Sequence, residues 1–174
     1  MESTITAYGE PANLADRLLS VGENAPEVLV VQQDFKDFLI GGAKDKPQLI
    51  LTVPSLDGEV CPREIEHFDE ILRNFSPRLY TYVISMDLPL AQRRYCIVYG
   101  IQNLHILSDF RYRNLRQYGV YIASGILQGL LARAAFVVDT EGKITYIQLV
   151  REQTDEPDYE EVRRAVEAVL AKAS

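Results

Sequence analysis

The chain alternates short apolar runs with longer stretches in which apolar residues recur every three or four positions. A short apolar run between turn residues is typical of a buried strand, and the longer spacing is typical of an amphipathic helix. The runs expected to form strands are Val28 to Gln32, Gln48 to Val53, Leu79 to Ser85, Leu104 to Leu107, Ala134 to Val138 and Lys143 to Val150. Because strands that alternate with helices form a sheet covered by helices, the sequence predicts an α/β fold.

The helical spacing is clearest in residues 62–75 and 159–170, which each place apolar side chains on one helix face. Shorter helices are predicted over 87–99, with Asp87 as the N-cap, and over 112–118. The acidic run from Glu64 to Glu70 is expected to be a solvated helix face. The segment Asp-Thr-Glu-Gly at 139–142 is typical of a hairpin turn between the last two strands. No linker divides the chain, so we expect one domain over residues 1–174.

Composition and charge exclude several classes of function. The 174 residues are 47% apolar, which is enough to build a core without disulfides or a metal. Lys and Arg number 18 against 25 Asp and Glu, and this net charge of −7 disfavours binding to nucleic acid. No apolar run reaches the roughly 18 residues of a membrane helix, and the N-terminal residues Met1 to Thr4 do not resemble a secretory signal. We expect a cytoplasmic protein with neither nucleic acid nor membrane as a partner.

Cys61 lies where a strand, a turn and a helix meet. The run from Gln48 to Val53 leads into the turn Pro54 to Glu59, and the helix is expected to begin immediately after Cys61, since Pro62 suits the first helical position. The N-terminus of a helix stabilises an anion, so it lowers the pKa of a thiol from about 8.5. Cys61 is therefore either a reactive thiolate or a small buried residue that happens to start a helix. With only one other cysteine, Cys96, and no zinc-like spacing, we expect no metal and no cofactor.

Several short segments between Val53 and Val150 carry a specific pattern. They are Val53-Pro54-Ser55-Leu56-Asp57, Val60-Cys61, Ile84-Ser85-Met86-Asp87-Leu88-Pro89, Ala91-Gln92-Arg93-Arg94-Tyr95-Cys96, Leu107-Ser108-Asp109-Phe110-Arg111, Tyr118-Gly119-Val120 and Gly129-Leu130-Leu131-Ala132-Arg133-Ala134. In these segments the chain resembles the thiol peroxidases, the atypical two-cysteine branch of the peroxiredoxins. The resemblance implies a thioredoxin-like fold with a mixed central sheet flanked by helices. It also implies an N-terminal β-hairpin within Thr4 to Leu14, in an extension formed by residues 1–20.

The same resemblance implies a role for each matching residue. Cys61 occupies the position of the peroxidatic cysteine, which a hydroperoxide oxidises to a sulfenic acid, and Cys96 that of the resolving cysteine, which then forms an intramolecular disulfide with it. Arg133 matches the active-site arginine, and Pro54 matches the proline that shields the cysteine. The family further implies recycling by thioredoxin or a similar dithiol, and a homodimer. Without the resemblance, Cys96 would be interpreted as a core residue and Arg133 as a strand-edge or ion-paired arginine.

The sequence departs from the family at Gly58, where the family has a threonine. That hydroxyl accepts from the bound peroxide and bonds the cysteine sulfur, and losing one such group typically costs about 10²- to 10³-fold in rate. Two hypotheses remain: a thiol peroxidase that reduces hydrogen peroxide and alkyl hydroperoxides, and a weakened relative that acts as a slow thiol switch or binding module. A different thiol-disulfide oxidoreductase is disfavoured, because no second cysteine lies within a few residues of Cys61.

Overall fold

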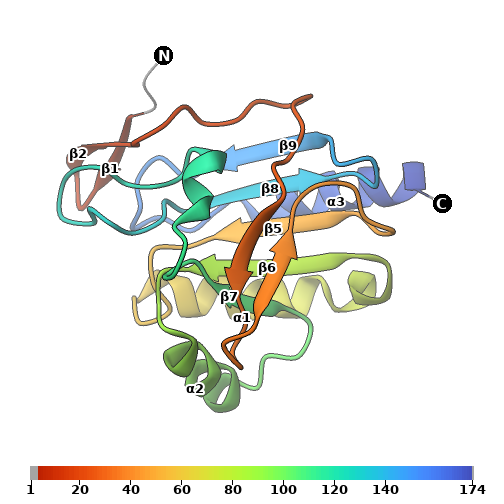
Figure 1. Ribbon diagram of the computed structural model, residues 1–174, viewed down its shortest axis with the longest axis horizontal. Coiled ribbons are helices and arrows are strands. Elements are labelled where there is room, and N and C mark those ends of the chain that lie inside the picture. Colours follow the sequence, from red (N-terminus) through yellow and green to blue (C-terminus); the bar gives the residue numbers. More distant parts are fainter. Residues whose placement is uncertain (1–3, 174) are drawn as a thin grey trace.

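The computed structural model describes residues 4–173, and within this range the chain forms a seven-stranded mixed sheet and a separate two-stranded hairpin (Figure 1). The strands are β1 (Thr4–Ala7), β2 (Glu10–Asn13), β3 (Val28–Val31), β4 (Asp37–Ile40), β5 (Gln48–Thr52), β6 (Tyr80–Ser85), β7 (His105–Ser108), β8 (Ala134–Val138) and β9 (Ile144–Leu149). The helices are α1 (Val60–Ile71), α2 (Pro89–Tyr99) and α3 (Tyr159–Ala173), with 3₁₀ helices η1 (Arg73–Arg78) and η2 (Asn114–Tyr118). Residues 1–3 of the predicted N-terminal extension, and residue 174, lie outside the described residues.

The sheet has the order β4-β3-β7-β6-β5-β8-β9. Strands β5, β6 and β7 are parallel to one another, and the remaining neighbours pair antiparallel. Parallel neighbours need crossover connections, which α1 and α2 supply. The prediction of a mixed sheet flanked by helices is confirmed, as is the N-terminal antiparallel hairpin of β1 and β2.

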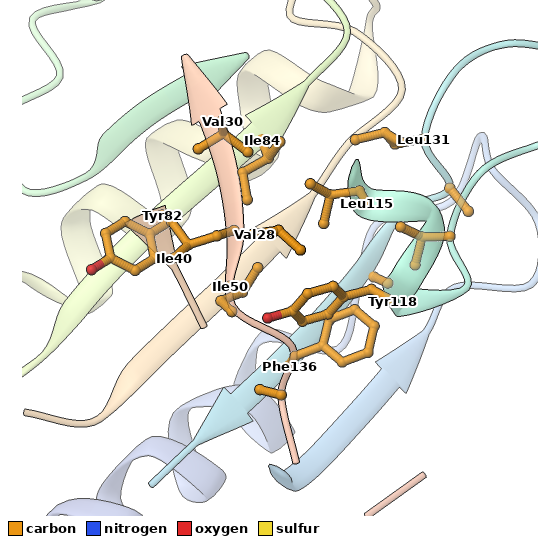
Figure 2. Close-up of a cluster of buried hydrophobic side chains, with 14 of the residues drawn as sticks. Val28, Val30, Ile40, Ile50, Tyr82, Ile84, Leu115, Tyr118, Leu131 and Phe136 are labelled. Atoms are coloured by element: carbon orange, nitrogen blue, oxygen red, sulfur yellow. The ribbon is translucent and has the colours of Figure 1, made fainter. Parts of the chain in front are cut away.

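Alternate residues of the central strands build the core on the two faces of the sheet. Leu49 and Leu51 of β5 pack with α1 and α3, which lie behind the sheet in Figure 1. Ile50 points to the opposite face, where η2 and the loops around it cover the strands. Figure 2 shows this second cluster, in which Tyr118 of η2 packs on Phe136 of β8. All five residues of β5 are buried, and its three central residues, Leu49 to Leu51, are all apolar, as expected for a strand covered on both faces.

Four local predictions differ from the structure. Strand β4 was not predicted, because it is short and begins with the charged Asp37. Helix α1 begins at Val60, before Cys61, and ends at Ile71, because the chain then tightens into η1, which contains Pro77. The N-cap of α2 is Leu88 and not Asp87. The predicted helix 112–118 is the 3₁₀ helix η2 and begins only at Asn114.

One of the two hairpin turns in the large sheet was predicted from its residues and the other was not. The predicted turn at 139–142 joins β8 and β9, and Asp139 accepts the backbone N–H groups of Glu141 and Lys143. The turn between β3 and β4 places Phe35 at a φ of 69°, a backbone region in which a bulky residue is uncommon, so its residues did not indicate a turn. Among residues 4–173 we find no helix with the length and apolar character needed to cross a bilayer.

Candidate active site

Cys61 lies in the first turn of α1, directly beyond the loop that leaves the end of β5. It is the second residue of the helix, and its side chain is buried with 2% exposed. The N-cap residue Glu59 makes no side-chain hydrogen bond to the helix. Pro62 still lies in the first turn, where a missing N–H costs the helix little. The strand-turn-helix arrangement predicted from the sequence therefore places the sulfur at the end of the sheet.

Strand pairing brings Arg133 to the same end of the sheet. Strand β8 runs antiparallel to β5, and their register pairs Thr52 with Ala134. Arg133, the residue before Ala134, therefore lies next to the point where the chain leaves β5 for the Cys61 loop. Two segments that are far apart in the sequence meet because β5 and β8 are neighbours.

The Arg133 guanidinium is fixed by three partners. Its Nη1 atom lies 3.1 Å from Cys61 Sγ and 2.5 Å from Glu64 Oε2. Its Nη2 donates to the Gln153 carbonyl at 2.9 Å, and the Arg133 backbone N–H donates to Gln153 Oε1 at 2.6 Å. The side chains of Arg133 and Glu64 are only 3% and 2% exposed. A buried guanidinium held by these partners directs its positive charge at the sulfur without having to reorganise.

The protonation of the site is governed by burial as well as by Arg133. Burial raises the pKa of the Cys61 thiol, while the Arg133 charge and a hydrogen bond from the Ser55 backbone lower it and the Glu64 charge raises it. Burial raises the pKa of Glu64 to about 7, although Arg133 favours its ionised form. The prediction of a lowered Cys61 pKa is therefore wrong for this conformation. Removal of the sulfur from water outweighs the stabilisation of the thiolate by its neighbours.

A cavity of about 350 Å³ opens next to the sulfur. Pro54 and Gly58 line it from the Cys61 loop, and Leu127 and Leu130 line it from the segment before β8. Cys61 and Arg133 also belong to its wall. Within residues 4–173 no group of three or more His, Cys, Asp or Glu side chains is arranged to hold a metal ion. The cavity therefore presents the Cys61 thiol and the Arg133 guanidinium beside apolar side chains, and Glu59 and Arg63 also belong to its lining.

Gly58 leaves space beside the sulfur. A Cβ atom at this position would lie 4.0 Å from Cys61 Sγ and 3.7 Å from the Ser55 carbonyl oxygen. The Gly58 backbone does not have a positive φ, so it does not require glycine. A larger side chain is therefore sterically allowed here, and it would reach the sulfur and the cavity.

Cys96 lies apart from this cluster, on the last turns of α2. Both cysteines are free thiols, and Cys96 is half-buried. Gln33, in the turn between β3 and β4, donates from Nε2 to Cys96 Sγ at 3.3 Å. The adjacent Tyr95 donates its hydroxyl to the Pro62 carbonyl at 3.3 Å, which connects α2 to the start of α1. Burial raises the pKa of the Cys96 thiol, and the Gln33 hydrogen bond opposes this.

Comparison with known proteins identifies the family. The family model described as Redoxin matches residues 20–162. The chain belongs to the redoxin family. Among curated relatives, this redoxin is 48% identical to the thiol peroxidase of Aquifex aeolicus (strain VF5) over 170 residues, 98% of this chain and 100% of the relative. It is 42% identical to the thiol peroxidase of Campylobacter jejuni over 157 residues, 90% of this chain and 88% of the relative. The predicted resemblance to the thiol peroxidases is confirmed.

Solved structures agree with this assignment. The redoxin superposes on the crystal structure of a peroxiredoxin-like protein from Aquifex aeolicus with a TM-score of 0.93 and 47% sequence identity, covering 97% of this chain and 98% of that one. The thiol peroxidase from Chromobacterium violaceum, at 20% identity, has the same fold with a TM-score of 0.85. The thioredoxin-like fold predicted from the sequence is thus confirmed over nearly the whole chain.

The redoxin site contains two residues that the sequence analysis missed. Glu64 was assigned to a solvated helix face, yet it is 1% exposed and pairs with Arg133. Its position three residues after Cys61 was the available signal, because residues at i and i+3 share one face of a helix. Gln153 gave no comparable signal, since its contact with Arg133 depends on the packing of the loop after β9.

Proposed function

We propose that the chain is a thiol-dependent peroxidase that reduces hydrogen peroxide and alkyl hydroperoxides at Cys61. The observation that carries the proposal is the 3.1 Å contact between Arg133 Nη1 and Cys61 Sγ beside a cavity. A guanidinium in this position stabilises the thiolate and also the charge that develops on the leaving oxygen. The family relationship to thiol peroxidases supports the same conclusion.

The reaction follows from the two thiols. The Cys61 thiolate attacks one peroxide oxygen, so that an S–O bond forms, the O–O bond breaks and the other oxygen leaves as water or an alcohol after taking up a proton. Cys61 is then a sulfenic acid. The Cys96 thiol gives up its proton and its sulfur attacks the sulfur of Cys61, so that an S–S bond forms, the S–O bond breaks and the leaving hydroxide takes up a proton to become water. A dithiol protein such as thioredoxin reduces the disulfide, and Cys61 and Cys96 return to thiols as the dithiol is oxidised.

The cavity supports substrates larger than hydrogen peroxide. Leu127 and Leu130, from the segment before β8, give it apolar lining. Apolar walls accept the hydrocarbon part of an alkyl hydroperoxide, while Arg133 faces the reacting oxygens. Pro54, on the Cys61 loop, is buried, lines the same cavity and keeps water from one side of the sulfur.

A second candidate function is a weakened relative that acts as a slow thiol switch or binding module. Gly58 favours it, since no side chain at this position bonds the sulfur or the substrate. The raised pKa of Cys61 also favours it, because less thiolate is present at neutral pH. In either case we propose one cytoplasmic domain over residues 1–174 that forms a homodimer and uses neither metal nor organic cofactor.

Cysteine variants test the proposal and the division of roles. We expect Cys61→Ser to abolish peroxide consumption, and Cys96→Ser to keep the first turnover while allowing a gain of about 32 Da, a sulfinic acid, at excess peroxide. Peroxide consumption in one turnover and intact mass are the measurements. Equal loss of the first turnover in both variants would contradict the assignment. A wild-type rate no faster than that of free cysteine would favour the switch or binding module.

A further inference from the structure

The Asp87 carboxylate bridges the two segments that carry the cysteines. Its Oδ1 atom accepts the Ser55 hydroxyl at 2.9 Å, and its Oδ2 accepts the Leu56 backbone N–H at 2.8 Å. Oδ2 also accepts the Ser85 hydroxyl at 2.7 Å. Ser55 and Leu56 belong to the loop before Cys61, and the Ser55 backbone in turn hydrogen-bonds the Cys61 sulfur. The carboxylate thus holds the loop that positions the sulfur.

The start of α2 is attached to the same cluster. Gln92, in the first turn of α2 and fully buried, donates from Nε2 to Ser85 Oγ at 3.1 Å and to the Leu107 carbonyl at 2.7 Å. Ser108 donates its hydroxyl to the Asp87 carbonyl at 2.5 Å. A continuous chain of hydrogen bonds therefore runs from the Cys61 loop through Asp87 and Ser85 to the helix that carries Cys96.

One member of this cluster is not satisfied. Among the described residues, Gln92 Oε1 is the buried side-chain nitrogen or oxygen without a hydrogen-bond partner. A buried acceptor without a donor destabilises the closed arrangement and regains a partner when water enters. The hydrogen bonds of the cluster therefore hold α2 in place, while the unpaired Gln92 Oε1 atom makes this closed arrangement less stable. Such a site is suited to open locally.

We propose that Asp87 is a positioning residue that makes the Cys61 loop and α2 open together when the disulfide forms. The inference rests on the proposed function, in which two thiols on separate helices must meet. Cys61 is buried with 2% exposed, Cys96 lies in α2 and both are free thiols, so under the proposed function the disulfide requires the segments that carry them to rearrange. Both segments bind the Asp87–Ser85 pair, so release of either one leaves this pair with fewer hydrogen-bond partners and weakens the cluster that holds the other. The closed form positions Cys61 for peroxide, and the open form permits the disulfide.

The test compares Asp87→Asn with Asp45→Asn by hydrogen exchange of the reduced protein without peroxide. Asparagine keeps the size of the side chain, but its amide nitrogen cannot accept the N–H of Leu56. Asp45 accepts the Tyr80 hydroxyl at the opposite end of the strands, so Asp45→Asn is the matched control. We expect protection in peptides 53–61 and 89–99 to fall together by about tenfold or more in Asp87→Asn alone, the scale of one charged hydrogen bond. Loss of protection in only one of these peptides would overturn the proposal.

A kinetic readout separates coupling from general destabilisation. With one equivalent of hydrogen peroxide, Asp87→Asn should react more slowly at Cys61 but form the disulfide faster, and it should yield less sulfinic acid at excess peroxide. Gln92→Leu, which frees α2 but leaves the carboxylate on the loop, should speed the disulfide step as well. Slower disulfide formation in both variants would contradict the inference. If wild type shows no fast reaction with peroxide, the proposed function fails, while the exchange experiment still decides whether the segments are coupled.

Discussion

The two cysteines lie in contrasting surroundings. Cys61 is buried, and its sulfur contacts Arg133, which Glu64 and Gln153 hold in place. Cys96 has Gln33 as its side-chain donor, and the next residues of α2, Ile97 and Val98, are 73% and 66% exposed. The first environment fixes a reacting atom, and the second places the other thiol on a helix turn whose neighbouring side chains face solvent. A thiol positioned by its neighbours and a second thiol on a more exposed helix turn suit a reaction in which the two act in successive steps.

Removing the positive charge that faces Cys61 should have the largest effect on the difference between the two cysteines. We expect Arg133→Met to lower the rate of the first turnover by about 10²- to 10³-fold, because the preorganised donor and the positive charge are both lost. Stopped-flow thiol loss measures this rate. Arg133→Lys is the matched control, which keeps the charge but not the planar set of donors, and it should recover only part of the rate. Full recovery with lysine would show that charge alone is needed.

The next largest effect is expected at Gly58. Gly58→Thr adds a hydroxyl beside the sulfur at a position where the backbone and the space allow it. If the peroxidase lacks one positioning group, the hydroxyl should make the first turnover at least about tenfold faster. The full effect of one such group is typically about 10²-fold. Gly58→Ala is the control that adds bulk without a hydroxyl. An equal or lower rate in Gly58→Thr would mean that the loop has adapted to glycine.

Glu64, beside Cys61, should make the unfolding free energy of the protein depend on pH. Its pKa of about 7 in the folded protein lies above the ordinary value of 4.5, so the folded state binds this proton more tightly than the unfolded state. The resulting stabilisation is complete below pH 4.5 and is lost as the pH rises through about 7. The unfolding free energy of wild type, minus that of Glu64→Gln, should therefore decrease between pH 4.5 and 8.

Urea unfolding of the reduced proteins measures this difference. Burial raises the pKa of Asp109 to about 6, so Asp109 titrates in the same range, but it is present in both proteins and cancels. In Glu64→Gln the Cys61 thiol loses a neighbouring negative charge, so its reaction with peroxide should reach half of its maximal rate at a lower pH. A difference in unfolding free energy that stays constant or grows with pH would contradict the assignment of Glu64.

The smallest effect is expected at Gln33. Replacing Gln33 with leucine removes the donor to Cys96 Sγ and loosens the attachment of α2 to the turn before β4. One neutral hydrogen bond corresponds to a change of about two- to tenfold. We expect disulfide formation to become faster by this factor, with an unchanged first turnover, as measured by mass after quenching with an alkylating agent. Gln32→Leu, at the neighbouring position, is the control.

The sequence was most informative where the reactive residue and the local structure that positions it are encoded by neighbouring residues. Cys61 at the start of a helix, and the apolar strand before it, were predicted from residues that are adjacent in the chain. Arg133 was identified only through the family resemblance, because its approach to Cys61 depends on the register of β5 and β8. Glu64 was misplaced because an acidic run indicates a solvated face, whereas partial burial of a helix end can place one of its members in an ion pair.

Asp87 is a second residue whose contacts with a distant segment could not be predicted from the sequence. Its position before a helix predicted an N-cap, and the carboxylate instead accepts the hydroxyl and the N–H of loop residues that lie 32 and 31 positions earlier in the chain. A capping residue and a bridging residue look identical in the sequence, because both are acids placed before a helix. The choice between them depends on which donors the fold brings near. Strand β4 was missed for a related reason, since its pairing with β3 outweighs a weak local preference.

The most direct test adds one equivalent of hydrogen peroxide to the reduced wild-type protein and follows thiol content and intact mass. The account predicts that the free thiols of Cys61 and Cys96 disappear together, at a rate far above that of free cysteine at the same pH. The mass should decrease by about 2 Da because the disulfide forms. Peptide mapping should then find Cys61 and Cys96 in one disulfide-linked pair. Loss of thiols no faster than for free cysteine, or a stable gain of about 16 Da with Cys96 still reduced, would contradict it.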